Sequence, residues 1–186
     1  MAEELRKIRR VVTAHDASGA AIVHSDGIAQ NVRVRASGGV TSTLLWTTDT
    51  TPAQYAADDR GAVQIGTAPP PQGTILRIVD FAPLPAGAAA VDQRSVLAEM
   101  GLAGHDTGGR RPPRHGAMHA TDSVDYALVL EGEIDMLLDE GEVHLRAGDV
   151  LVQQGTNHAW VNRGTRPCRV AFVLVGAVAP AFPTGS

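Results

Sequence analysis

The sequence predicts an all-β domain, built as a sandwich or a barrel. Short apolar segments, most of them four to eight residues long, recur at even spacing, above all beyond residue 116. Glycine, proline and asparagine separate these segments, as expected for turns between strands. Only one stretch of the chain has the apolar spacing of a helix. The 186 residues fit one domain, and with 4% aromatic residues its core must be largely aliphatic.

The amino-terminal part predicts a series of strands. The expected strands cover residues 10–13, 20–24, 31–35 and 41–47, with turns at Ser18-Gly19, Asp26-Gly27 and Gly38-Gly39. A loop region follows at 49–73 and contains three consecutive prolines at 69–71, which favour extended backbone. The alternating segment 74–81 predicts one more strand. We interpret 1–85 as a β-rich arm that packs on a barrel.

The next segment, 86–112, predicts an insertion with helical and loop structure. Val96, Leu97 and Met100 are spaced as on one face of a helix, and Gly101 follows as a stop signal. Glycines and prolines dominate residues 108–113 and favour an extended connection. Long non-strand segments in compact domains are often functional loops, so we expect this insertion to cover the mouth of the barrel.

The carboxy-terminal part, 113–186, predicts the core of the barrel. The expected strands cover residues 126–130, 134–138, 143–145, 150–153, 158–161 and 169–175. Glycine-containing turns separate most of them. Such short and evenly spaced strands are typical of a sandwich or barrel. All three parts are expected to form one structural domain.

Polar side chains in this part are placed so that they can face the interior. Side chains alternate along a strand, so His158, Trp160 and Asn162 share one face. If that face and those of Asp125 and His119 line the barrel, the buried groups need partners or a metal, because an unpaired buried charge is costly. Two imidazoles and one carboxylate with open positions suit Fe(II), and also Zn(II), Mn(II) or Ni(II).

Three segments of the carboxy-terminal part resemble the motifs of a known family. Residues 130–133, 146–150 and 155–162 resemble the two conserved motifs of the cupin superfamily. The segments 10–16, 25–27, 43–46, 118–119 and 124–126 are similar to single-domain cupins of bacteria and of fungal biosynthetic gene clusters. This resemblance implies a cupin double-stranded β-helix, also called a jelly-roll barrel. Relatives of this kind are often described as oxidoreductases.

The first motif departs from the usual cupin pattern of His-x-His followed by a glutamate. Ala117 stands where the first histidine is expected, and Asp125 replaces the glutamate. The resemblance therefore implies a reduced set of metal ligands, namely His119, Asp125 and His158. His115 is the best candidate for a fourth ligand.

Each of these residues also has a structural interpretation. Either histidine can be a buried residue without a metal, and Asp125 can bind turn amides at the start of a strand. His115 can be a loop histidine. For the substrate pocket we select Trp160, Tyr126 and Asn162, although Trp160 can equally pack in the core and Asn162 can cap a turn.

The function expected from these residues is that of a metal-dependent cupin enzyme acting on a small organic molecule. An oxygenase or another oxidoreductase is favoured, because two histidines and a carboxylate suit Fe(II) with Zn, Mn or Ni as other possible metals. A metal acting as a Lewis acid would instead support an isomerase, dehydratase or lyase. A cupin that binds a metal or small ligand without turnover is the third alternative.

Composition restricts the partners and the compartment. The formal net charge of -4 argues against nucleic acid and anionic membranes as partners. No apolar run is long enough for a membrane span, and the charged start lacks the apolar run of a secretion signal. The single Cys168 suits a reducing compartment, so the cytoplasm is expected. A long β-rich arm with an edge to cover predicts a homodimer.

Overall fold

The computed structural model describes residues 7–35, 39–84, 92–103 and 112–179, and the statements below refer to these residues. Within them lie eleven strands and one helix. Their bounds are β1 (Arg9–His15), β2 (Ala21–Ile28), β3 (Val32–Arg35), β4 (Val40–Thr48), β5 (Thr74–Phe81), α1 (Gln93–Glu99), β6 (Ser123–Glu131), β7 (Glu133–Leu138), β8 (Glu142–Arg146), β9 (Val150–Gln154), β10 (His158–Val161) and β11 (Cys168–Gly176). The prediction of an all-β fold is confirmed.

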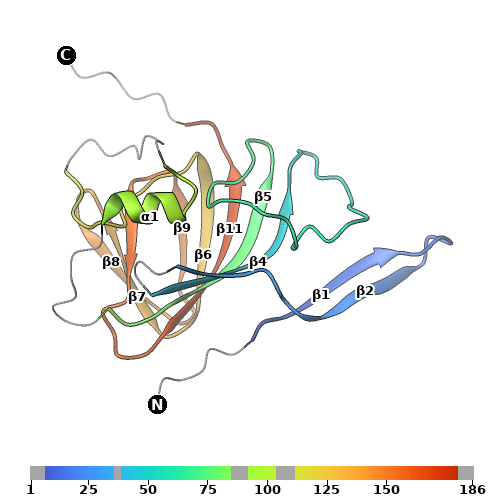
Figure 1. Cartoon of the computed structure of the whole chain (residues 1–186), viewed down its shortest axis with the longest axis horizontal. Helices are drawn as coiled ribbons and strands as arrows, with labels where there is room; N and C mark the ends of the chain where they lie inside the picture. The colour runs from blue at the N-terminus through green and yellow to red at the C-terminus, as the bar shows by residue number, and fades with distance from the viewer. Residues whose placement is uncertain (1–6, 36–38, 85–91, 104–111, 180–186) are drawn as a thin grey trace.

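Two sheets form the body of the molecule (Figure 1). The larger has six strands in the order β3-β4-β5-β11-β6-β9, and the smaller has three in the order β10-β7-β8. They share one apolar core, to which the large sheet contributes Val129 and Val170 and the small sheet contributes Ile134 and Leu145. Neighbours in the sheets are distant in sequence, as β11 pairs with both β5 and β6. This is the expected jelly-roll arrangement.

The alternation along β6 decides which of its side chains face the interior. Ser123, Asp125, Ala127 and Val129 are each at most 4% exposed. Tyr126, which lies between them, is 42% exposed. Side chains on a strand point alternately to the two faces of the sheet, so one face of β6 supplies the interior and the other faces solvent.

The amino-terminal part corrects two expectations. Strands β3, β4 and β5 hydrogen-bond into the six-stranded sheet, so residues 1–85 are not an arm packed on a separate barrel. The β1–β2 hairpin projects from the body (Figure 1). The turn expected at Asp26-Gly27 is also wrong, because both residues lie within β2, where they pair with Val11 and Arg10. Asp26 instead binds Arg9 across the hairpin, at 2.5 and 2.7 Å.

The single described helix confirms the helical pattern around Val96. Asp92 is its N-cap and accepts the amide hydrogen of Ser95 at 3.0 Å, which satisfies one of the free donors at a helix start. Gly101 ends the turn with a φ of 72°. Residues 86–91 and 104–111 of the expected insertion lie outside the described residues. Among the described residues, no helix has the length and apolar character needed to cross a membrane.

Candidate functional site

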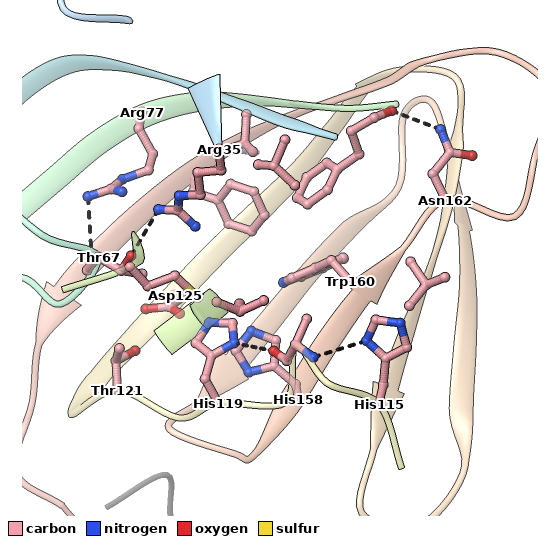
Figure 2. A pocket seen from close by; sticks show the side chains of 18 of the residues that line it. Arg35, Thr67, Arg77, His115, His119, Thr121, Asp125, His158, Trp160 and Asn162 are labelled. Carbon is pink, nitrogen blue, oxygen red and sulfur yellow. Dashed lines mark hydrogen bonds between the residues drawn. The ribbon is translucent and has the colours of Figure 1, made fainter. Parts of the chain in front are cut away.

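A cavity of about 120 Å³ lies inside the barrel (Figure 2). Both sheets contribute to its wall, and α1 adds Val96 and its C-cap Met100. Its polar lining gathers groups from distant parts of the chain. They are Arg35, Thr67, Arg77, His115, His119, Thr121, Asp125, His158 and Asn162.

The two predicted histidine ligands lie side by side. His119 and His158 form an isolated antiparallel bridge, in which each backbone amide donates to the other's carbonyl at 2.9 Å. Their ring centroids are 4.4 Å apart. Because the bridge fixes both backbones, the two imidazoles enter the cavity from one point of its wall.

Each of these rings is held through its Nδ1 atom. Nδ1 of His119 lies 2.9 Å from the carbonyl oxygen of Ala117, which can only accept a hydrogen bond. Nδ1 of His158 lies 3.0 Å from the carbonyl oxygen of Thr156 and 2.8 Å from the side-chain amide of Gln153. On His119 the proton therefore lies on Nδ1 and leaves the lone pair on Nε2, the tautomer that ligates metals. On His158 the Thr156 carbonyl favours the same tautomer, whereas the Gln153 amide nitrogen is a donor and favours a lone pair on Nδ1.

Both rings are neutral near pH 7. Burial lowers the pKa of His119 to about 4. Burial, followed by the charge of His119, lowers the pKa of His158 to about 3. A neutral imidazole is the form that binds a metal, so the buried surroundings favour the binding form.

Asp125 is the one carboxylate among the described lining residues. Its Oδ1 accepts the Ser123 hydroxyl at 2.6 Å, and that hydroxyl lies 2.8 Å from the Thr121 hydroxyl. Burial raises the pKa of Asp125 to about 6, while Ser123 and the charge of Arg77 oppose the shift. The carboxylate can therefore gain or lose a proton close to neutral pH, as a general acid or base must.

His115 also lines the cavity, but its ring is held differently. Its Nδ1 accepts the backbone amide hydrogen of Ala117 at 3.1 Å. In a neutral ring the other nitrogen then carries the proton. In this arrangement His115 offers a hydrogen-bond donor, and a ligand role would require its ring to release Ala117.

Two of the three predicted substrate-pocket residues line the cavity. Trp160 does so and packs edge-on against Phe172, with ring centroids 5.3 Å apart. Asn162 does so as well, although its side chain also donates to the carbonyl oxygens of Phe81 and Arg166 at 2.9 and 2.8 Å. The prediction for Tyr126 is wrong, because alternation along β6 turns its side chain to the outer face.

Comparison with known proteins identifies the family. The model of the cupin domain matches residues 105–175. The cupin-domain-containing oxidoreductase srdD of Neurospora crassa is 32% identical over 183 residues, covering 92% of this chain and 76% of that protein. This chain belongs to the cupin superfamily.

Another relative of this cupin is phomopsin biosynthesis cluster protein C' of Diaporthe leptostromiformis. It is 34% identical over 183 residues, which cover 94% of this chain and 81% of that protein. Among solved structures, the Cnp3 cupin domain of Schizosaccharomyces pombe matches with a TM-score of 0.45 and 8% identity, over 91% of this chain and 88% of that one.

The cavity of this cupin fits a metal only in part. The imidazoles of His119 and His158 are adjacent and neutral, and Nδ1 of His119 donates to a backbone carbonyl, as in metal-binding histidines. Asp125 lines the same cavity. However, no three His, Cys, Asp or Glu side chains of the described residues form a group that could hold a metal ion. The set of three or four ligands, including His115, stays a prediction.

Three lining or supporting residues were missed in the sequence. Arg77 faces inward between the buried Ile75 and Val79, so a charged residue at an inward position of an alternating strand was the available signal. Arg35 is preceded by the exposed Val34, which reverses the usual pattern. Gln153 carries no signal of its own in the sequence, because its contact with His158 depends on the tertiary structure.

Proposed function

We propose that this cupin is an oxidoreductase that acts on a small organic molecule in the barrel cavity, beside a divalent metal held by His119 and His158. The adjacent, anchored imidazoles carry this proposal. Relatives named cupin-domain-containing oxidoreductases support it. Asp125 is the third candidate ligand, because its carboxylate lines the same cavity.

The chain's own residues have distinct roles in this proposal. A bound Fe(II) would supply oxidation chemistry with dioxygen, whereas Zn(II), Mn(II) or Ni(II) would supply Lewis-acid chemistry. Trp160 and Phe172 form an apolar wall that orients the organic part of a substrate and excludes water. When not acting as a ligand, Asp125 accepts or returns a proton at its carboxylate, with Ser123 holding the group in place.

One observation favours a second candidate, a cupin that binds a small ligand without turnover. The described residues contain no group of three potential ligands in a metal-binding arrangement. In this alternative the cavity and its polar lining remain the binding site, and the two histidines serve only to shape it.

Metal analysis separates the two candidates. Protein purified without oxygen and loaded with Fe(II) is expected to hold close to one metal per chain. His158→Ala is expected to lower the metal affinity by about a hundredfold or more. A side chain that binds the metal directly contributes at least as much to the affinity as the groups that hydrogen-bond to it. His144→Ala is the matched control, since His144 lies outside the cavity lining and binds Asp135.

The outcome against the metal proposal is equally specific. Metal content far below one equivalent, or content unaffected by His158→Ala, would contradict it and favour the non-catalytic candidate. Full metal content without oxygen uptake on any organic substrate tested would favour Lewis-acid chemistry by an isomerase, dehydratase or lyase.

We also propose that two copies of this cupin pair through the β1–β2 hairpin. The hairpin projects from the body and exposes Val11, Val23 and Ile28 by 48%, 61% and 43% (Figure 1). A two-stranded hairpin is only marginally stable by itself in water, so contact with a second copy would stabilise it. Light scattering should give twice 19.4 kDa, and Val23→Lys should shift the mass toward the monomer. A wild-type monomer would contradict this pairing.

A further inference from the structure

Strand β5 places a cation among apolar side chains. Arg77 is 7% exposed and shares the interior face with Ile75, Val79 and Phe81, which are at most 8% exposed. Its Nη2 donates to the carbonyl oxygen of Gly66 at 2.7 Å, with a longer contact of 3.5 Å to that of Thr67. Its Nε is buried without a hydrogen-bond partner. Buried donors are nearly always paired, but the described residues supply no partner for this nitrogen.

Strand β3 adds a second cation to the same side of the cavity (Figure 2). Its valines face outward, with Val34 78% exposed, while Arg35 lines the cavity. Nη2 of Arg35 donates to the Thr67 hydroxyl at 3.1 Å. Apolar burial alone would favour the opposite orientation of this strand, with the valines inside.

The same sheet shows how this protein compensates a buried arginine elsewhere. Arg169 and Asp80 form a buried pair with contacts of 2.6 and 3.0 Å. Within the parts of the chain described, neither Arg35 nor Arg77 has an ion pair within 4.0 Å. Asp125 and Glu99 act on them only at longer range, and Asp125 directs its Oδ1 to Ser123 instead.

We propose that Arg35 and Arg77 bind the carboxylate of an organic acid whose apolar part lies against Trp160 and Phe172. Guanidinium groups match the geometry of a carboxylate and bind it through charge-assisted hydrogen bonds. A ligand carboxylate would supply the missing partner of the Arg77 Nε and balance two cations faced by a single lining aspartate. This substrate class rests on the cavity being the ligand site in the proposed function, and it does not depend on a metal.

The test compares an acid with its neutral amide. Metal-stripped protein is titrated with 3-phenylpropanoate and with 3-phenylpropanamide, which differ in charge and little in shape, by calorimetry. The acid is expected to bind about tenfold or more tightly, as charge-assisted hydrogen bonds imply. Arg35→Gln is expected to remove this preference. Arg33→Gln is the matched control, because Arg33 lies on the same strand, is exposed and does not line the cavity.

Arg77→Lys provides a second variant that keeps the charge. It is expected to weaken acid binding while keeping some preference over the amide, since lysine lacks the fork of donors. Equal binding of acid and amide, no acid binding at millimolar concentration, or a preference that survives Arg35→Gln overturns the proposal. Because the protein is metal-free, a negative metal analysis leaves this result unaffected, and the two proposals can fail separately.

Discussion

The two halves of strand β6 build two different interiors from one alternating pattern. Toward its end, Val129 faces the apolar core shared with Ile134 and Val170. Toward its start, Asp125 faces the cavity that also holds His158. All of these side chains are at most 4% exposed. Burial alone therefore does not distinguish core from site, and the chemistry of the buried group does.

The energetics of the two halves have opposite signs. Apolar side chains stabilise the fold when they leave water, by roughly 25 cal/mol per Å². Charged groups lose hydration, which is why burial raises the pKa of Asp125 and lowers the pKa of His158 and Arg77. A polar half that lowers stability and is nevertheless present is typical of a functional site.

The largest expected effect is in the apolar half. Ile134→Ala should lower the free energy of unfolding by about 2–5 kcal/mol, because it leaves a cavity in a packed core. Urea denaturation measures this loss, and the acid preference of the surviving folded protein should be unchanged. Val143→Ala on neighbouring β8 is the control, since Val143 is 37% exposed and should change stability by only about 0.5 kcal/mol. Equal losses of unfolding free energy in both variants would contradict the assignment of Ile134 to a packed apolar core.

Asp125→Asn should raise the free energy of unfolding of the metal-free protein near neutral pH, whereas Ile134→Ala lowers it. The pKa of Asp125 rises from 3.8 to about 6 on folding, so its stabilising contribution is full below pH 3.8 and is lost as the pH rises to about 6. Above that pH, the variant should be more stable than the wild type by roughly 1–3 kcal/mol. Urea midpoints between pH 4 and pH 7 measure the difference.

The histidines make the pH dependence of this experiment specific. His119 and His158 have lowered pKa values, so their contribution is full above pH 6.5 and is lost as the pH falls toward about 4 and about 3. Without Asp125, stability should therefore rise more steeply between pH 4 and pH 6. Asp58→Asn, at an exposed loop position, should follow the wild type. A constant difference at all pH values would contradict this account.

Gln153→Ala tests whether the polar half depends on residues beyond the lining. The side chain contacts Nδ1 of His158, so its removal should reduce metal affinity by about 10–100-fold while leaving the fold intact. Gln154→Ala is the control, because Gln154 is the next residue on β9 and is exposed. Matching affinities in the two variants would show that Gln153 does not position the ring.

The smallest effect is expected on the outer face of β6. Tyr126→Phe should change neither the acid preference nor the metal content, because Tyr126 points away from the cavity. Its stability should change by less than about 0.5 kcal/mol. A loss of ligand binding in this variant, measured in the same titration, would mean that the outer face takes part in function.

Much of the fold could be predicted because strand signals are local. Strands β5 and β10 have the predicted bounds, and the helix pattern around Val96 holds because an apolar stripe and a terminal glycine lie within one short segment. The mistaken turn at Asp26-Gly27 shows the limit of this signal. There, pairing with β1 and the ion pair to Arg9 kept a turn-like dipeptide in a strand.

The candidate site could be predicted only in part. The motif resemblance and the alternation selected His158, Trp160 and Asp125, which do line the cavity. Arg77 and Arg35 were not selected, because their place in the cavity lining, with no ion pair to another described residue, arises only in the folded chain. No local sequence pattern indicates whether a carboxylate distant in the sequence lies close to either arginine in the folded chain.

The amino-acid order by itself determined the all-β class, the alternation that sends side chains inward or outward, and the membership in the cupin superfamily. The tertiary structure alone decided that the backbones of His119 and His158 are bridged, that β3 joins the barrel sheet, and that two arginines share one cavity. The reason is physical. Strand periodicity is encoded within a few neighbouring residues, whereas charge balance and ligand geometry arise between strands that meet only after folding.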